Sequence, residues 1–113
     1  MEELKIALKM DAVIQYGYVA MSRFPKSERH VLCQEIRLAM WGIQRALIVT
    51  AKRYHKKTTL QDLDADIELL RRQIRIAKDL GFLPFKQYET WSRHVNEVGA
   101  MTGAWIKREK ERG

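Results

Sequence analysis

Residues 59–81 read TLQDLDADIELLRRQIRIAKDLG, and the apolar residues in this stretch repeat with the period of a helix. Six of them recur at alternating spacings of three and four, which is the seam of a helix packed almost parallel to its neighbours. Thr59 stands where an N-cap is expected, and Gly81 stands where a helix commonly ends. The stretch therefore predicts one long bundle helix. Its expected core residues are Leu60, Leu63, Ile67, Leu70, Ile74 and Ala77.

Three interruptions divide the 113-residue chain around this helix. They are Pro25, Pro84 and the segment HKKTTLQD at residues 55–62. The four stretches between them are each about 20 to 27 residues long, which is too long for strands and typical of bundle helices. A chain of this length is expected to form a single domain, here residues 1–113. The sequence therefore predicts an all-α fold, an up-down antiparallel four-helix bundle.

The last stretch repeats the apolar pattern and contains two glycines. Gly99 and Gly103 each lower helix propensity by about 1 kcal/mol relative to alanine. We expect them to let a neighbouring helix approach closely. The predicted core residues of this helix are Tyr88, Trp91, Val95, Val98, Thr102 and Trp105.

The first two stretches carry more apolar residues than one core-facing stripe requires. The second includes LAMWGIQRALIVTAKRYHKK at residues 38–57, which is apolar on every side and contains only positive charges. At about 100° per residue, a core stripe ending at Leu47 and Tyr54 leaves a second apolar stripe on the far side. Scattered surface hydrophobics would be the simpler explanation, but a tryptophan with three aliphatic residues on one arc favours self-association or a protein partner. The expected oligomer interface comprises Leu38, Trp41, Ile48 and Val49, with Met10 and Val13 from a second stripe of the first stretch.

The net charge of +7 is concentrated in one part of the chain. Residues 23–57 contain nine basic and two acidic residues, which leaves twelve of each sign elsewhere. Such concentration indicates a polyanion or an acidic protein as partner, whereas a merely solvated face, the alternative, would normally include acids. Trp41 either closes a subunit interface or lies within the basic surface. The residues expected to meet the partner are Arg37, Arg45, Lys52, Arg53, Lys56 and Lys57.

The sequence offers little support for catalysis. His30 and Cys33 share a helix face, but a zinc site needs further ligands and a Cys–His catalytic pair needs an orienting group. We expect no enzymatic activity, no metal and no cofactor; an enzyme using His30 and Cys33 is the competing hypothesis. A single cysteine fits a reducing compartment, and no apolar run reaches the roughly 18 residues of a membrane span. The expected location is the cytoplasm, without membrane association.

Two long segments resemble a known protein family. They are FPKSERHVLCQEIR at residues 24–37 and LDADIELLRRQIRIAKDLGFLPFKQYETWSRHVNEVGAMTGAWIK at residues 63–107. Both are similar to the accessory variability determinant (Avd) proteins of diversity-generating retroelements. They also share features with a sister group, the four-helix-bundle proteins encoded in intervening sequences of bacterial 23S rRNA genes. Trp105 favours the Avd group.

The resemblance to Avd implies a fold, an assembly and a set of partners. It implies a four-helix bundle that forms a homopentameric barrel with a basic surface, binds a reverse transcriptase and nucleic acid, and supports mutagenic copying of template RNA into cDNA. No catalytic centre is implied. The alternative group implies an RNA-associated structural role without a reverse transcriptase. Because the family has no strict signature for its binding residues, the assignment of the six basic residues to nucleic-acid or polymerase binding rests on charge placement.

Overall fold

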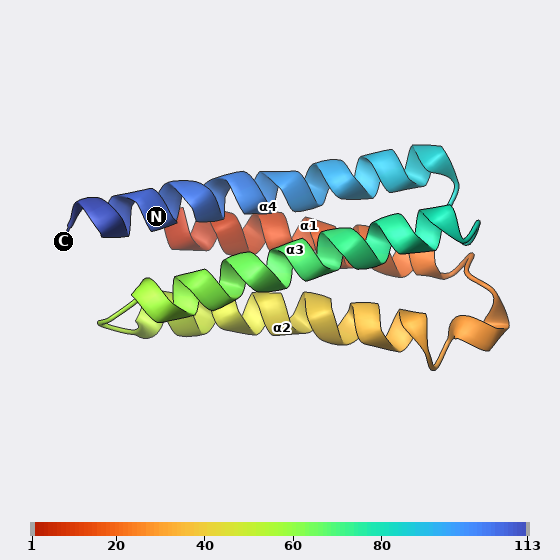
Figure 1. Cartoon of the computed structure of the whole chain (residues 1–113), viewed down its shortest axis with the longest axis horizontal. Coiled ribbons are helices and arrows are strands. Elements are labelled where there is room, and N and C mark those ends of the chain that lie inside the picture. Colours follow the sequence, from red (N-terminus) through yellow and green to blue (C-terminus); the bar gives the residue numbers. More distant parts are fainter. Residues whose placement is uncertain (1, 113) are drawn as a thin grey trace.

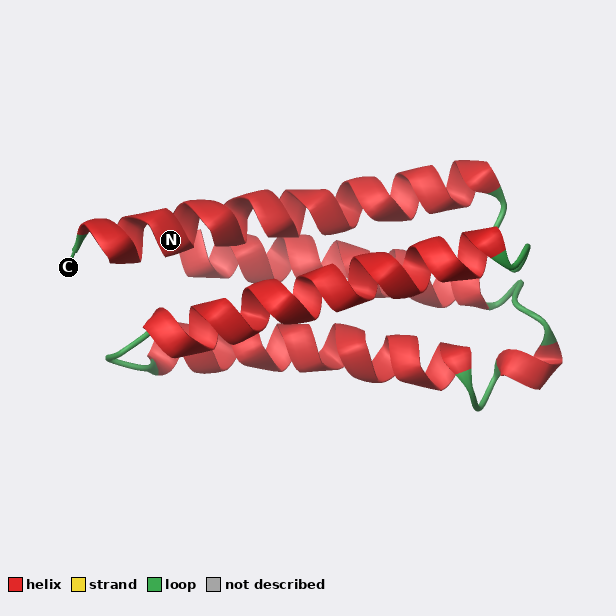
Figure 2. Cartoon of the chain, viewed as in Figure 1, coloured by secondary structure: helices red, strands yellow, loops and turns green. Residues whose placement is uncertain are grey.

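Four antiparallel helices account for almost all of residues 2–112, the part of the chain that the computed structural model describes (Figure 1). Each helix packs against two others, in the cyclic order α1, α2, α3, α4. The molecule is elongated, with principal extents of 47 × 24 × 20 Å. A short 3-10 turn, η1, lies between the first two helices (Figure 2). The elements are α1 (Glu2–Met21), η1 (Lys26–Glu28), α2 (Leu32–Lys52), α3 (Lys57–Asp79) and α4 (Phe85–Glu111).

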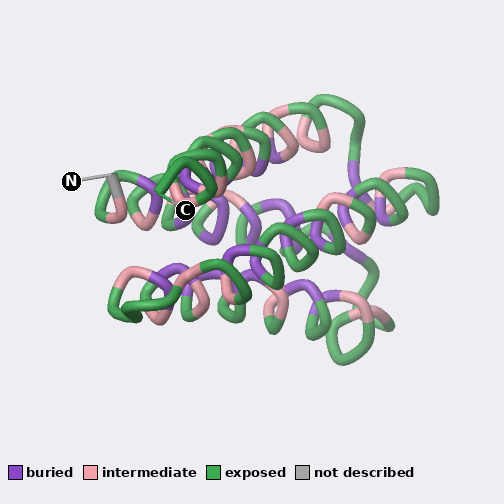
Figure 3. Tube along the Cα trace, turned by 60° about the vertical axis from the view of Figure 1, so that its left-hand side comes forward, coloured by how far each residue is buried: buried purple, intermediate pink, exposed green. Residues whose placement is uncertain are grey.

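The seams predicted for α3 and α4 contribute a large part of the core. All six apolar residues of the α3 pattern are buried. In α4 the pattern is buried from Trp91 to Trp105, and only Tyr88, near the start of the helix, is partly exposed. Buried positions therefore recur once per turn along the inner side of the helices, as Figure 3 shows. The predicted all-α four-helix bundle is confirmed.

The structure corrects the assignment of the two apolar stripes of α1. Met10 and Val13, expected at a subunit interface, lie in the monomer core with exposed fractions of 1% and 0%. Gly17 explains why this stripe of α1 faces the core. A Cβ at this position would lie 2.7 Å from the Trp91 ring and 2.8 Å from the sulfur of Met40. The absence of a side chain lets both large residues pack against α1. Met10 and Val13 therefore cannot contribute to a surface between subunits.

Gly17 also has the role that was expected of the two glycines in α4. A Cβ on Gly99 would collide with the Arg71 guanidinium, so this glycine makes room for one long side chain. A Cβ on Gly103 would meet no atom within 4 Å. The prediction that these two glycines permit close approach of a helix was therefore wrong.

The helix containing residues 38–57 ends earlier than its sequence pattern suggested. α2 stops at Lys52, and Arg53 has an extended backbone. Tyr54, predicted to continue the core stripe, lies in the loop with 91% of its surface exposed. Thr59 is already inside α3, where its hydroxyl donates a hydrogen bond to the carbonyl of Lys56 over 3.0 Å. It is not the N-cap.

Gly81 ends α3 as expected. Its φ is +83°, a left-handed conformation that glycine adopts without strain. The amide of Gly81 donates to the carbonyl of Lys78, and the amide of Phe82 donates to that of Ala77, both over 2.9 Å. This paired arrangement is the Schellman motif, which turns the chain back toward α4. Pro84 then precedes α4 without a side-chain cap.

Candidate nucleic-acid interface

The predicted basic residues extend from the second turn of α2 to the start of α3. Arg37 lies in the second turn of the helix and Lys52 at its last residue. Their separation of fifteen residues corresponds to about 22 Å at 1.5 Å per residue. Arg45 lies between them and is exposed, as are Lys52 and Arg53. The cations therefore line the length of α2, and Arg37 belongs to a different end of the bundle from Lys57.

Lys56 is already engaged within the protein. Its ammonium group donates to the carbonyls of Thr50 and Ala51 over 3.0 and 3.2 Å, and also to that of Arg53. These carbonyls belong to the last turn of α2 and the residue after it, where helical partners are missing and the helix dipole is negative. Lys56 thus caps α2 and fixes the α2–α3 loop. Of the six predicted basic residues, Lys56 donates to three backbone carbonyls and Arg37 to one, that of Arg29.

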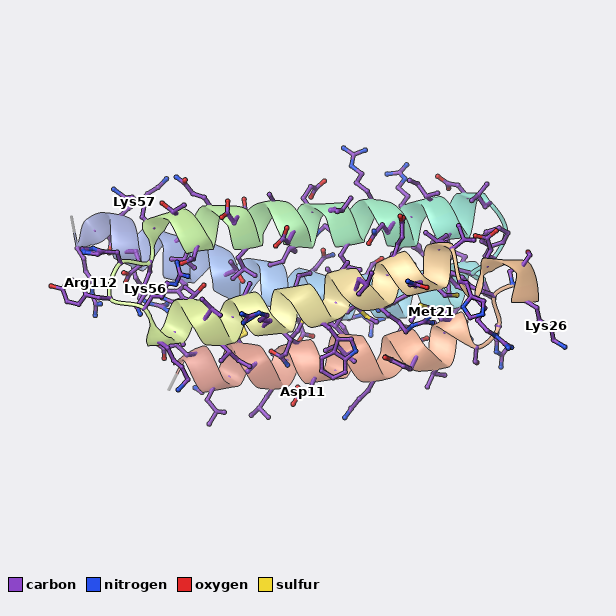
Figure 4. All side chains as sticks on the ribbon, turned by 90° about the horizontal axis from the view of Figure 1, so that it is seen from below. Asp11, Met21, Lys26, Lys56, Lys57 and Arg112 are labelled. Atoms are coloured by element: carbon purple, nitrogen blue, oxygen red, sulfur yellow. The ribbon has the colours of Figure 1, made fainter. Side chains whose placement is uncertain are left out.

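The cations of the α2–α3 loop border a surface cleft at one end of the bundle. The cleft has a volume of about 570 Å³. Arg112, from the end of α4, contributes to it, and Figure 4 shows Lys56, Lys57 and Arg112 together at this end. Arg112 pairs with Glu109 over 3.4 Å, which partly offsets its charge. The cleft is lined by Arg53, Tyr54, His55, Lys56, Lys57, Glu109 and Arg112.

Arg112 was not among the residues identified from the sequence. It is separated from the basic segment of residues 23–57 by more than fifty positions. An up-down bundle nevertheless places the C-terminus of α4 beside the α2–α3 loop, since both lie at the same end. The run of charged residues at 107–112 was the available signal, once combined with the topology.

The apolar residues of α2 that were predicted to form a subunit interface are exposed or partly exposed. Leu38, Trp41 and Ile48 have exposed fractions of 65%, 53% and 49%, and Val49 is partly exposed. The Trp41 indole N–H donates to the hydroxyl of Tyr18 on α1 over 3.1 Å. Trp41 therefore lies across the junction of the two helices, between the cations at the two ends of α2.

Gln44, which precedes Arg45 on α2, turns toward α1. Its side-chain Nε2 donates to the Asp11 carboxylate over 2.7 Å and to the carbonyl of Ala7 over 3.1 Å. The residue is almost fully buried. It therefore joins α1 to α2 and is not available to a ligand.

His30 and Cys33, the candidate catalytic pair of the competing hypothesis, differ in exposure. Cys33 is buried and His30 is exposed. Burial raises the pKa of the Cys33 thiol, and the Arg37 guanidinium opposes this only in part. A thiol with a raised pKa stays protonated at neutral pH and is a poor nucleophile. Among residues 2–112, no three His, Cys, Asp or Glu side chains gather where they could hold a metal ion.

None of the helices in the described part of the chain is long and apolar enough to cross a membrane. This agrees with the charged residues that interrupt every apolar run.

One comparison with known proteins identifies a family. The sequence model of a family described as bAvd-like matches residues 4–109. The match spans all four helices and the basic residues of α2 and its loop. No curated protein matches the chain.

Proposed function

Because the chain belongs to the bAvd-like family, we propose that it is a noncatalytic accessory protein of a diversity-generating retroelement. In this role it binds the reverse transcriptase and nucleic acid, either template RNA or cDNA, and supports mutagenic retrohoming. The family match over residues 4–109 is the observation that carries the proposal. It favours the Avd group over the proteins of rRNA intervening sequences.

The exposed cations of α2 and the following loop are the proposed contact for nucleic acid or polymerase. Arg45, Lys52, Arg53 and Lys57 are exposed, and within residues 2–112 none of them forms an ion pair. Unpaired cations at helical spacing can approach successive phosphates and release the counterions bound there. Lys56 supports this surface by holding the loop in place.

The exposed apolar residues of α2 are the proposed interface between subunits. Leu38, Trp41, Ile48 and Val49 would be covered by a neighbouring copy in a homo-oligomer, for which the family resemblance implies a pentameric barrel. A ring of copies would repeat the basic surface, so several weak phosphate contacts would act together.

A charge-reversal experiment tests the proposed basic surface. The variant Arg53→Glu/Lys57→Glu should weaken binding to the retroelement's template RNA, and to its reverse transcriptase, by at least about ten-fold at low salt, because it replaces two exposed cations with anions. Fluorescence anisotropy measures the first binding event and co-purification the second. The matched control, Lys86→Glu/Arg93→Glu, changes the net charge equally at exposed positions of α4. Equal loss in both variants would refute the site, and no binding by the wild-type protein would refute the function.

A further inference from the structure

A second concavity lies at the opposite end of the bundle. It has a volume of about 510 Å³ and is formed by the end of α1, the η1 turn and the start of α2. In Figure 4, Met21 and Lys26, which line it, lie at the end away from Lys57 and Arg112. Its size falls within the roughly 300–1,000 Å³ typical of sites for small molecules.

The rim of this concavity is positively charged. Lys26, Arg29 and Arg37 line it, and among the described residues no aspartate or glutamate does. The basic cleft at the other end differs in this respect, because Glu109 lines that cleft and pairs with Arg112. Arg37 donates one N–H to the carbonyl of Arg29 over 3.2 Å, which holds the guanidinium at the rim. The other N–H groups of this guanidinium remain for a ligand. A fixed guanidinium with remaining donors is suited to a phosphate group.

The floor of the concavity is apolar and aromatic. Met21, Phe24 and Cys33 line it and are buried, and the Tyr18 ring is partly exposed at its side. The Phe24 ring packs against the Phe82 ring with centroids 5.9 Å apart. The hydroxyl of Tyr18 accepts the hydrogen bond from Trp41, which restricts the orientation of the ring. An aromatic surface held in place in this way suits the flat face of a nucleobase.

We propose that this concavity binds one nucleotide of a single-stranded nucleic acid. The base lies against Tyr18 and the apolar floor, and the adjacent phosphates contact Arg29 and Arg37. A base within a duplex is stacked between its neighbours and cannot enter such a site, so the concavity selects single strands. The inference rests on the proposed function and adds to it the form of nucleic acid that this end of the bundle recognises. An acidic peptide would use the cations but would gain little from the aromatic floor.

The test compares single-stranded with double-stranded RNA. A fluorescein-labelled RNA of twelve nucleotides and mixed sequence is titrated by anisotropy, alone and annealed to its complement. Arg29→Gln should weaken single-strand binding several-fold and reduce the slope of log K against log salt by about 0.7, the value for one phosphate contact on a single strand. Tyr18→Leu should weaken it by about five-fold or more without changing the slope, because stacking is lost and no charge is removed.

Controls separate loss of contact from loss of structure. Tyr18→Phe keeps the ring but loses the hydrogen bond from Trp41, so it should lose much less binding than Tyr18→Leu. Arg93→Gln removes an exposed cation of α4 and should change little. Circular dichroism melting verifies that each variant is folded. Should Tyr18→Leu fail to fold, photo-crosslinking of a 5-iodouridine-substituted RNA to the wild-type protein gives the same information, with the crosslink expected at Tyr18.

Each remaining outcome overturns the inference. If the wild type binds single-stranded RNA and neither Arg29→Gln nor Tyr18→Leu weakens it, the nucleotide site is refuted while the proposed function stands. Equal losses for single strand and duplex would indicate a nonspecific phosphate surface. If polyglutamate displaces the RNA efficiently and Tyr18→Leu has no effect, the surface recognises an acidic protein. If the wild type binds neither form of RNA, the inference and the nucleic-acid part of the proposed function both fail.

Discussion

The outer surfaces of α3 and α2 differ in whether their charged side chains form ion pairs. On α3, Glu68 accepts from both Arg71 and Arg72, at 3.3 and 3.4 Å, and Arg75 lies 4.0 Å from Asp79. These pairs follow the three- and four-residue spacings of a helix and neutralise the surface locally. On α2, the exposed cations that follow Glu35 have no acidic partner among residues 2–112.

The difference extends to apolar exposure. The α1–α2 side carries Leu38, Trp41 and Ile48 close to its unpaired cations, whereas α3 exposes Leu69 and Ile76 beside paired charges. A surface with both unneutralised charge and apolar area is one that a partner completes. The comparison therefore agrees with placing the proposed interactions on the α1–α2 side of the bundle.

The largest predicted effect contrasts Trp41, on the α1–α2 side, with Trp91, a core residue of α4. Trp91→Ala should lower the free energy of unfolding by about 3–5 kcal/mol, because it leaves a cavity beside Gly17 and removes the hydrogen bond from the indole to the carbonyl of Val13. Trp41→Ala should cost only about 1 kcal/mol, since half of that side chain is already in water. Urea denaturation measures both. Similar costs would mean that Trp41 is part of the structural core.

The second prediction tests the exposed apolar residues of α2. Leu38→Glu/Ile48→Glu should shift the protein toward the monomer, weakening self-association more than ten-fold, because burial of each side chain contributes about 1.5–3 kcal/mol. Multi-angle light scattering across a concentration series gives the mass. The matched control is Leu69→Glu/Ile76→Glu on α3, which introduces the same charges at similarly exposed positions. Dissociation by the control instead would place the interface on α3.

The smallest predicted effect on stability concerns the lysines at the end of α2 and in the following loop. Lys56→Met should lower the free energy of unfolding by about 1 kcal/mol, because three backbone carbonyls at the end of α2 lose their donor. Lys52→Met, one turn earlier on the exposed side, should change it by less than about 0.5 kcal/mol. Chemical denaturation distinguishes them. Equal stabilities would show that Lys56 is as available to a ligand as its neighbours.

The sequence predicted the regular part of the fold well. It failed in α1, where two stripes of the helix are equally apolar and either could face the core. The α3 seam was identified completely because charged residues flank it on both sides. In α1 both stripes are apolar, and the choice between them depends on Trp91, which contacts Val13 from 78 positions away. No local pattern contains that information. Met10 and Val13 were therefore assigned to the wrong surface.

The candidate site was predictable to a similar extent. The exposure of Arg45 and Lys52 followed from helical spacing and charge. Arg53 and Lys57 are also exposed, but they lie beyond the end of α2. The capping role of Lys56 did not follow from the spacing, because it depends on where α2 ends and how the loop turns. Arg112 required the topology of the whole bundle. Residue exposure that depends on helix periodicity could thus be predicted from the sequence. Contacts that depend on where the chain turns back could not.

The hydrogen bonds of Gln44 determine the register of α1 against α2. Helices joined only by apolar contacts can slide along each other by one turn, about 5.4 Å, and still bury similar residues. Such a slip here would separate Gln44 from Asp11 and Ala7 and leave a buried amide without partners, a loss of about 1–3 kcal/mol. The two helices are therefore joined in one register, so Tyr18, Trp41 and the cations of α2 would be presented to the proposed partner at fixed mutual spacing.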